Sequence, residues 1–476
     1  MLDGWDIATQ RRRLPNGYWR WPVDEVAIPN RIHLVGAGGA GMSGLAKLLS
    51  QRGHTVSGSD LKPGLMLAGL DDVGVETWIG HAPSRMHDVD LVVVSSAVPE
   101  SDPEVSAARL AGVDVWRRPA LLNALTSQIP TTGVAGTHGK TTSTALIVTA
   151  MRGVGLDPTF LVGGHMIGLN TGAHLGDPTR LVLEADEAFG TFRHLVLDSI
   201  LVTNIEADHL DHYETLAGLE DAFSQVVGRV VGPRIGCIDD PGIRRLAQRV
   251  DLTTYGFDPG ADWVVSDLTH AGGSSRFTVS SSDHRIVVTL PKPGAHLALN
   301  ATGVIALLDS LGVDAEAGAA ALSEFQGVRR RYEIAARVGD ITVVDDFAHH
   351  PTEVGATIAA AREGTEGAVI AVFQPHRYTR TADLAPLFGR PLALADRVFV
   401  TDVYAAGEPP IIGVSGRIVA EAVEAAGGRA SYVPRVADVA ERVVSVAKPG
   451  DTILLLGAGD INATATDIVS IVGGHA

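Results

Sequence analysis

Residues 131–142 read TTGVAGTHGKTT, a short apolar segment that runs through a glycine-containing loop into Lys140 and Thr141. A strand, a glycine loop and a helix in this order are typical of a phosphate-binding loop. The loop departs from the strict GxxxxGK[ST] pattern, because Val134 occupies the first glycine position. The amides of residues 136–140 are expected to form an anion-binding nest, Lys140 to place a charge on the β- and γ-phosphates, and Thr141 to bind magnesium. The predicted ATP-binding residues of the loop are Gly136, Thr137, His138, Gly139, Lys140, Thr141 and Thr142.

Strands and helices alternate on both sides of this loop. The predicted strands are 31–35, 55–58 and 91–95, then 131–135, 181–184 and 200–204, and finally 341–345, 368–373, 397–401 and 452–456. A Gly/Ser-rich alternating region at 263–290 is expected to be antiparallel, and helices are expected at 297–311 and 417–426. This alternation predicts an α/β fold with largely parallel sheets. At 476 residues the chain suits three domains, for which we predict an N-terminal extension at 1–30 and domains at 31–126, 127–328 and 329–476.

A second glycine motif, GAGGAG at 36–41, follows the apolar strand IHLV and precedes an apolar helix at 42–49. Such glycines allow a tight turn and let backbone amides approach a diphosphate at a helix N-terminus. Asp60 ends the next strand, where folds of this kind carry a ribose-binding acid. Taken alone, the motif indicates NAD. A dehydrogenase has no use for the phosphate-binding loop at 131–142, however, and a simple NTPase has no use for the glycine motif at 36–41.

Two acidic segments follow strands near the phosphate loop, EADE at 184–187 and NIEADH at 204–209. Carboxylates in that position are expected to hold magnesium directly or through water, and Glu184 is the first candidate. His209 is harder to interpret from the residues alone, because magnesium prefers oxygen ligands and a lone histidine is more often structural.

The composition excludes several classes of protein. A formal net charge of −17 argues against a general nucleic-acid binder. The one cysteine, Cys237, cannot form an internal disulfide, which fits a reducing compartment, and we expect it to be buried. The sequence contains neither an apolar run long enough for a membrane span nor the apolar centre of a signal peptide. We therefore expect a cytoplasmic protein with no membrane partner.

The chain resembles the Mur ligases of peptidoglycan synthesis from about residue 32 to its end. The motifs that carry the resemblance are GVAGTHGKTT, EADE, TNIEADHLDHY, FQGVRRRYE, DDFAHHPTEV and FQPHRYTRT. The resemblance implies three domains: a Rossmann-like UDP-binding domain, a central ATPase domain, and a Rossmann-like C-terminal domain that closes over the site. It also implies ATP-dependent joining of L-alanine to the lactyl carboxylate of UDP-N-acetylmuramate through an acyl phosphate. The glycine motif at 36–41 then holds the UDP diphosphate rather than NAD.

The resemblance also implies roles for particular residues. Lys140, His209 and His349 are the implied catalytic residues, and Thr141, Glu184 and His209 the implied magnesium ligands, with a second magnesium at His209. Asn300, Arg331 and Asp346 join the ATP site at adenine, phosphate and ribose. His349, Arg377 and Arg380 are implied to recognise the alanine and lactyl carboxylates, a task that suits the planar guanidinium. The implied UDP-sugar residues are Gly36, Gly38, Gly39, Gly41, Asp60, Ser95, Ser96, Thr191, Arg377 and Arg380.

Three positions depart from the family's usual residues. The sequence Ala-Phe-Gly-Thr-Phe at 188–192 replaces a common Ser-Asp-x-Ser-Phe, Leu297 replaces an asparagine, and Phe347-Ala348 replaces Tyr-Gly. The last variant is shared with the recycling ligase that joins UDP-N-acetylmuramate to a tripeptide. That ligase is the first alternative; GAGGAGMSG and FQPHRYTRT favour alanine instead. A nicotinamide-linked oxidoreductase and a non-catalytic nucleotide sensor are the alternatives from other classes. The expected oligomeric state is a monomer or a weak homodimer.

Overall fold

The computed structural model describes residues 5–6, 11–13, 19–20 and 26–474. These residues form two compact units, which are described separately. The first runs to Ser266 and includes Thr278–Val288 and Leu299–Phe325; the second comprises Asp267–Phe277, Thr289–Ala298 and Gln326–Ala476. Ahead of the first large sheet, three short strands pair antiparallel: β1 (Trp5–Asp6), β2 (Arg11–Arg13) and β3 (Trp19–Arg20).

The first large sheet has five parallel strands in the order β6-β5-β4-β7-β8. They are β4 (Arg31–Val35), β5 (Thr55–Asp60), β6 (Glu76–Ile79), β7 (Leu91–Val94) and β8 (Asp114–Arg117). Helices α1 (Ala40–Gln51) and α4 (Arg118–Gln128) pack their apolar side chains on one face, and α3 (Pro103–Leu110) packs on the other. The short helix α2 (Leu65–Ala68) follows β5. This is a doubly wound arrangement, which binds ligands at the carboxyl ends of its strands.

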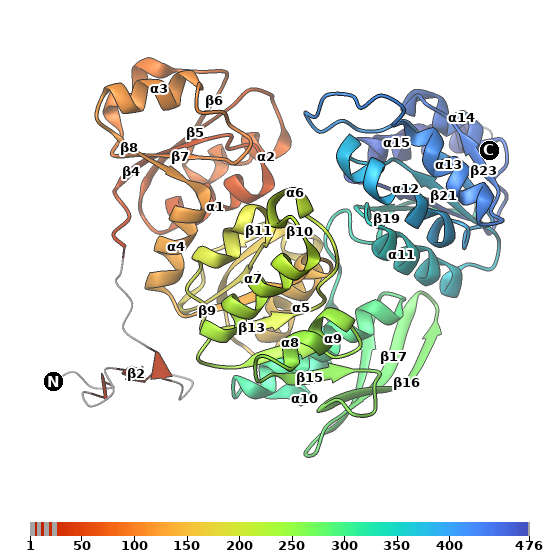
Figure 1. Ribbon diagram of the computed structural model, residues 1–476, viewed down its shortest axis with the longest axis horizontal. Coiled ribbons are helices and arrows are strands. Elements are labelled where there is room, and N and C mark those ends of the chain that lie inside the picture. Colours follow the sequence, from red (N-terminus) through yellow and green to blue (C-terminus); the bar gives the residue numbers. More distant parts are fainter. Residues whose placement is uncertain (1–4, 7–10, 14–18, 21–25, 475–476) are drawn as a thin grey trace. The chain divides into compact units, whose positions relative to one another are not determined.

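The second sheet has ten strands in the order β11-β10-β12-β9-β13-β14-β15-β16-β17-β18. Their bounds are β9 (Thr131–Ala135), β10 (Pro158–Met166), β11 (Thr171–His174), β12 (Asp177–Glu184), β13 (Ser199–Val202), β14 (Arg234–Cys237), β15 (Thr253–Gly256), β16 (Trp263–Ala271), β17 (Ser274–Ser280) and β18 (Arg285–Leu290). β9 is wholly buried and lies between β12 and β13, parallel to both. The loop after β9 therefore opens at the middle of the sheet's carboxyl edge, beside the ends of β12 and β13 (Figure 1).

Six helices accompany the second sheet: α5 (Lys140–Gly153), α6 (Leu210–Tyr213), α7 (Leu216–Arg229), α8 (Pro241–Ala247), α9 (Ala295–Ser310) and α10 (Ala315–Ala321). The apolar side chains of α7 and α8 join those of α1 and α4 in one continuous cluster. Helix α1 also contacts β10 and β11, and α4 contacts the 3₁₀ segment η4 (Ala188–His194). Within the first unit, the glycine-motif domain is therefore packed against the phosphate-loop domain by a shared apolar core.

The second unit contains a six-stranded sheet in the order β19-β20-β24-β21-β22-β23, in which only the β19–β20 pair is antiparallel. The strands are β19 (Glu333–Val338), β20 (Ile341–Asp346), β21 (Val369–Phe373), β22 (Arg397–Val400), β23 (Ala430–Tyr432) and β24 (Thr452–Leu456). Helices α11 (Pro351–Gly364), α12 (Tyr378–Leu392) and α13 (Gly416–Ala425) cover one face. Helices α14 (Val439–Val444) and α15 (Thr464–Gly474) cover the other.

The predicted α/β class is confirmed, and β4, β9 and β24 have the predicted bounds. The region 263–290 forms three strands that neighbour one another in the sheet, and the two-residue turn Gly272–Gly273 between β16 and β17 has positive φ at both positions, as in an antiparallel hairpin. Eleven of the described strands were not expected: β1, β2, β3, β6, β8, β10, β11, β14, β15, β19 and β23. In the part of the chain that the structure describes, no helix is long and apolar enough to cross a membrane.

Candidate functional site

The loop between β9 and α5 is held open by glycines and by the neighbouring strand. Gly136 and Gly139 have φ of +129° and +81°, a conformation that costs a residue with a Cβ considerably more. Asn300 of α9 packs on Gly139, where an added Cβ would lie 3.1 Å from its Oδ1. Asn204, after β13, accepts hydrogen bonds from the amides of Thr137 (3.1 Å) and His138 (2.8 Å).

These two hydrogen bonds bear on the predicted anion-binding nest. Of its five amides, those of Thr137 and His138 donate to the backbone and side-chain oxygens of Asn204. What the loop presents to an anion is therefore the N-terminus of α5, whose N-cap Gly139 offers no side-chain cap. A helix of this length binds phosphate at its N-terminus through its free amides and its dipole.

Lys140 does not extend freely from the loop. Its ammonium donates to both carboxylate oxygens of Glu187 at 2.9 Å and to the carbonyl of Gly136 at 2.7 Å, and it lies 3.6 Å from Asp186. Glu187 is buried, and burial raises its pKa despite the opposing charge of Lys140. The pKa of Lys140 is raised, since the charges of Glu187 and Asp186 outweigh the desolvation that would lower it. The lysine is therefore charged and paired with the acidic segment.

The candidate magnesium ligands lie around the same strand ends. Glu184 is the last residue of β12 and pairs in register with Val134 of β9, which places it beside the phosphate loop. Its Oε1 accepts from the amide of Gly163 at 2.6 Å. Thr141 is buried in the first turn of α5. Hydroxyl and carboxylate oxygens are the ligands that magnesium prefers, so these residues fit the ion.

His209 occupies a constrained position. It is the N-cap of α6 with φ of +55°, and its Nε2 lies 3.8 Å from the carboxylate of Asp208. The pKa of Asp186 is lowered, because Lys140, the amide of Ala188, Arg118 and His209 together outweigh the effect of burial. His209 is therefore close to the lysine and its acids, as the resemblance implies, although imidazole remains a weak ligand for magnesium.

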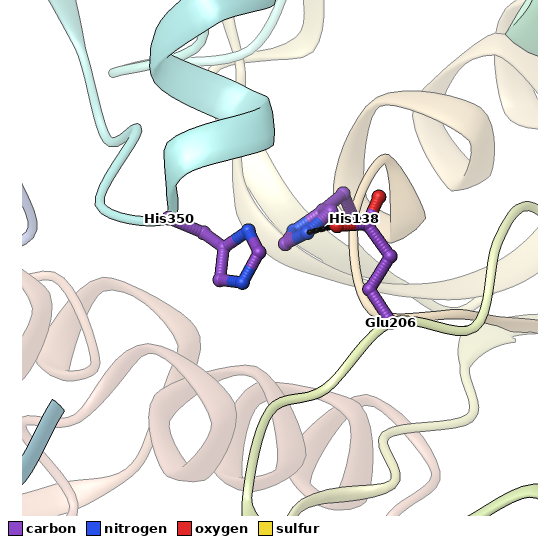
Figure 2. Close-up of side chains that lie close together, drawn as sticks. All are labelled: His138, Glu206 and His350. Carbon is purple, nitrogen blue, oxygen red and sulfur yellow. Dashed lines mark ion pairs between the residues drawn. The ribbon is translucent and has the colours of Figure 1, made fainter. Parts of the chain in front are cut away.

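A second histidine stands on the loop itself. Figure 2 shows His138 beside Glu206, with an ion-pair distance of 3.8 Å between Nε2 and Oε2. The amide of Thr137 donates to the carbonyl of Asn204, and the hydroxyl of Thr137 accepts the amide of Glu206. Hydrogen bonds therefore join the loop to the segment after β13 at several points. The third side chain labelled in Figure 2, His350, belongs to the second unit, where it caps α11.

The glycine motif forms a tight turn at the carboxyl end of β4. Gly36 has φ of +81° and packs against Ser95, whose Cβ would lie 3.1 Å from a Cβ added at Gly36. Asp60 accepts the amide of Gly38 at 2.9 Å and that of Lys62 at 3.2 Å, so this carboxylate braces the loop. Ser96 is exposed beside Ser95, whereas Thr191 is buried in the other domain of this unit and donates to the carbonyl of Ala188.

In the second unit, Asp346 ends β20 and is buried. Its oxygens accept the amides of Tyr332 and Ala348, each at 2.7 Å. Burial raises the pKa of Asp346 to about 6, against the charge of Arg331 and these two amides. Burial likewise raises the pKa of Asp345 to about 6, although Arg330 lies 3.5 Å away.

The three arginines at 329–331 have different environments. Arg329 pairs with Glu333, and Arg330 donates to the carbonyls of Gly457 and Gly459, so both are committed to their own unit. Arg331 lies over the ring of Phe347 at 4.9 Å, with only a long ion pair of 3.9 Å to Glu353. Of the three, Arg331 is the one that could turn to a phosphate most easily.

A cluster of basic and aromatic side chains surrounds the start of α12. Glu408 pairs with the Nε of Arg377 at 2.5 Å, and the buried Arg380 lies 3.4 Å from Nδ1 of His376. His376 stacks on Tyr404 with ring centroids 5.6 Å apart. Burial and the charges of Arg380 and Arg377 lower the pKa of His376 to about 4, so this imidazole is neutral and the arginines carry the positive charge.

His349 joins this cluster from the other side. Its ring lies edge-on to those of Phe347 and His376, with centroids 5.4 Å and 5.9 Å apart, and Nδ1 is 2.9 Å from the carbonyl of Phe347. The second unit thus brings His349, Arg377 and Arg380 together, as a carboxylate-binding site requires.

The structure therefore assembles the predicted residues in two groups. The first unit gathers the phosphate loop, Asn300, Glu184 and His209, with the glycine motif at a second sheet; the second unit gathers Arg331, Asp346, His349, Arg377 and Arg380. Three important residues were not predicted: Glu187, Asn204 and Glu408. Glu187 and Asn204 lie in segments that the sequence marks as acidic strand ends, so that signal was available; nothing in the sequence distinguishes Glu408.

Comparison with known proteins places this geometry in a family. Residues 31–129, 134–308 and 330–459 match, in that order, the regions described as "Mur ligase family, catalytic domain", "Mur ligase middle domain" and "Mur ligase, glutamate ligase domain". The chain is 41% identical over 464 residues to the UDP-N-acetylmuramate--L-alanine ligase of Mycolicibacterium gilvum, covering 94% of this chain and 97% of that protein. It is 39% identical to the ligase of the same name from Thermobifida fusca, over 95% and 99% of the two chains.

Solved structures give the same result. The UDP-N-acetylmuramate-alanine ligase MurC of Thermotoga maritima superposes with a TM-score of 0.80 at 28% identity, covering 94% of this chain and all of that one. The murein peptide ligase of Psychrobacter arcticus gives a TM-score of 0.67 at 26% identity, over 93% and 98% of the chains. The predicted three-domain fold is confirmed by these similarities.

Proposed function

The chain belongs to the Mur ligase family, and on that premise we propose that it joins L-alanine to the lactyl carboxylate of UDP-N-acetylmuramate at the expense of ATP. The observation that carries this function is the similarity, at about 40% identity over nearly the full length, to proteins named UDP-N-acetylmuramate--L-alanine ligase. The chain also has a lysine in its phosphate loop, which pairs with a buried acidic segment. Family membership sets aside the nicotinamide-linked alternative, which in addition gives Lys140 no role.

The chemistry follows from the poor reactivity of a carboxylate. Its oxygen is a poor leaving group, so transfer of the γ-phosphoryl group to the lactyl carboxylate first makes an acyl phosphate and ADP. The amine of L-alanine then attacks the carbonyl, and phosphate leaves as the amide forms. Both steps bring anions together, so positioning and charge compensation are the main tasks. We assign the compensation to Lys140, Arg331 and the N-terminus of α5, and the recognition of alanine to His349, Arg377 and Arg380.

The acceptor amine is the point that needs an experiment. Phosphate release is measured with ATP, Mg²⁺ and UDP-N-acetylmuramate, plus either L-alanine or the tripeptide that the recycling ligase uses. We expect release with alanine alone. Release with the tripeptide alone would identify a recycling ligase, and release that needs no acceptor would point to a simple ATPase.

Magnesium is part of the proposal, with Thr141 and Glu184 as its ligands and a second ion near His209. An ion held by these residues would neutralise negative charge on the phosphates. Glu184→Gln removes one carboxylate charge but keeps an oxygen where Gly163 donates. We expect the Mg²⁺ concentration for half-maximal activity to rise, with little change in thermal stability. A magnesium titration of wild type and variant checks this, and superimposable curves would remove Glu184 from the metal site.

Asp346 provides a pH-dependent prediction. We propose that its carboxylate accepts a ribose hydroxyl of ATP. Because its folded pKa is about 6, it takes up a proton as pH falls through that value. We therefore expect ATP affinity to weaken below about pH 6, where a protonated acid is a poorer acceptor. Asp346→Asn should weaken binding at higher pH and abolish this titration.

The adjacent acid supplies the control. Asp345 also has a pKa of about 6 but faces Arg330. Asp345→Asn should therefore keep the pH dependence of ATP affinity, measured by calorimetry. For both acids the folded pKa lies above the unfolded value, so each destabilises the fold above about pH 6 and ceases to do so as pH falls toward 4. A pH-independent ATP affinity in the wild type would contradict the role of Asp346.

The domain boundaries, the location, the oligomeric state and several ligand contacts are also proposals. We propose domain boundaries near residues 31, 127 and 329, a cytoplasmic location where ATP and the UDP-sugar are available, and a monomer or weak homodimer. The adenine contact of Asn300 and the UDP-sugar contacts of Ser95, Ser96 and Thr191 are proposed on the family resemblance. For Asn300, the packing against Gly139 supports a place at the nucleotide.

A further inference from the structure

Arg118 is an arginine that neither the sequence motifs nor the proposed chemistry has used. It is the first residue of α4, directly after β8, and its neighbour Arg117 points to the loop after β7, where it donates to the carbonyls of Ser95 and Val98. Arg118 instead lies against Gly41 in the first turn of α1. A Cβ added at Gly41 would lie 3.0 Å from Nη1 and 3.1 Å from Cζ of Arg118.

The guanidinium of Arg118 has a donor that the described residues leave unsatisfied. Its Nε is shielded from solvent and has no hydrogen-bond partner among the residues that the structure describes. Within that part of the chain, no carboxylate lies in ion-pair range of Arg118 either. Its charge does help to lower the pKa of the more distant Asp186. A buried donor left unsatisfied costs free energy, so such a group usually marks a place where a ligand supplies the acceptor.

The adjoining helix end has the same requirement. Helix α1 has 12 residues, its N-cap Gly39 provides no side-chain hydrogen bond, and its first turn contains no acid. The amides at this end and the guanidinium of Arg118 therefore bring positive charge to the glycine motif, where Asp60 binds the amide of Gly38 but forms no ion pair with Arg118 among the described residues.

We propose that Arg118 binds the diphosphate of the UDP-sugar, clamping it from α4 against the N-terminus of α1. This inference rests on the proposed function, because the UDP-sugar is the diphosphate ligand that the function supplies. The planar guanidinium can bind two phosphate oxygens at once.

Calorimetric titration of the full-length chain with UDP, UDP-N-acetylglucosamine and UDP-N-acetylmuramate tests the proposal. All three carry the diphosphate, and only the last carries the lactyl carboxylate. Arg118→Gln should weaken all three by a similar factor of about 10 to 100, the loss expected for a charged hydrogen bond. Arg118→Lys should recover part of the affinity, since it restores the charge without the planar fork.

Arg109→Gln is the matched control. It removes the same charge from the same domain, but from an exposed arginine that pairs with Glu100 at the surface. We expect its affinities to stay within about a factor of three of wild type. Binding of an ATP analogue should be unchanged in both variants, which shows that the phosphate-loop domain remains folded.

The failures can be told apart. Loss of affinity for UDP-N-acetylmuramate alone would place Arg118 at the lactyl carboxylate and overturn the diphosphate assignment. Unchanged affinities in both Arg118 variants, with an active wild type, would overturn the inference and leave the proposed function intact. A wild type that binds none of the three UDP compounds would instead overturn the proposed function.

Discussion

Lys140→Met is expected to abolish turnover while leaving the affinity for UDP-N-acetylmuramate unchanged. The variant removes the charge that we place on the transferring phosphoryl group, and the loss of one such preorganised group lowers kcat by about 10²- to 10³-fold. UDP-sugar affinity should persist, since the glycine motif lies at the end of β4, on a different sheet. Phosphate release and calorimetric binding measure the two quantities. Loss of UDP-sugar binding would contradict the separation of the two sites.

The same variant should also be less stable, in a pH-dependent manner. Lys140 is the partner of Glu187, which is 1% exposed, and breaking a buried pair on one side costs about 3 to 5 kcal/mol. The pKa of Glu187 is already raised by burial and rises further without the lysine. A raised carboxyl pKa destabilises the fold fully above the folded pKa, and this penalty disappears as pH falls from the folded pKa to the lower unfolded pKa. The stability difference from wild type should therefore shrink as pH is lowered.

A double variant separates the two effects. Lys140→Met with Glu187→Leu removes both charges and fills the site with apolar side chains, a change that is often neutral for stability. We expect thermal unfolding close to wild type and activity as low as in the single variant. Recovered activity in the double variant would mean that Lys140 serves only to neutralise Glu187, and its proposed role at the phosphate would be wrong.

Strand positions were predictable where the sequence gives a clear boundary. β9 and β24 are short, fully buried apolar runs bounded by loops rich in glycine and polar residues, so the parallel-sheet pattern is plain. β10 was missed because it begins at Pro158 and contains Gly163 and Gly164, which weaken the strand signal, and its register with β11 shifts. β11 is a four-residue edge strand, too short to show a period.

The candidate site was predictable in its residue types but not in its pairings. The acidic segment 184–187 was recognised as a group, yet which acid meets Lys140 depends on the turn after β12, where Phe189 and Gly190 have positive φ. Likewise, Asn204 was known to follow a strand, but its two hydrogen bonds to the loop depend on β13 lying directly beside β9. Neighbouring strands in a parallel sheet are far apart in sequence, so such contacts appear only in the fold.

Arg377→Ala should lower kcat/KM for L-alanine by about 10- to 100-fold, mainly by raising KM. The proposed contact is a charged hydrogen bond to the alanine carboxylate, worth about 1.5 to 3 kcal/mol. His376 cannot replace the lost charge, because its pKa is about 4 and the imidazole is neutral at assay pH. Glu408, which holds the Nε of Arg377 in the wild type, keeps its hydrogen bonds from Thr379 but loses its cationic partner, so its charge opposes the substrate carboxylate. Initial rates over a range of alanine concentrations measure the effect.

Arg377→Gly is the matched control, because Arg377 has φ of +73° at the N-cap of α12. A left-handed φ costs a residue with a Cβ about 1 kcal/mol or more, and alanine bears that cost as arginine does, whereas glycine does not. The glycine variant should therefore unfold at a higher temperature than the alanine variant, with the same defect toward L-alanine. If the glycine variant regained alanine use, the defect would belong to the strained backbone, and Arg377 would not be a substrate ligand. Equal kinetic losses with unequal stability would show that the guanidinium binds the substrate and that the unusual backbone serves to place it.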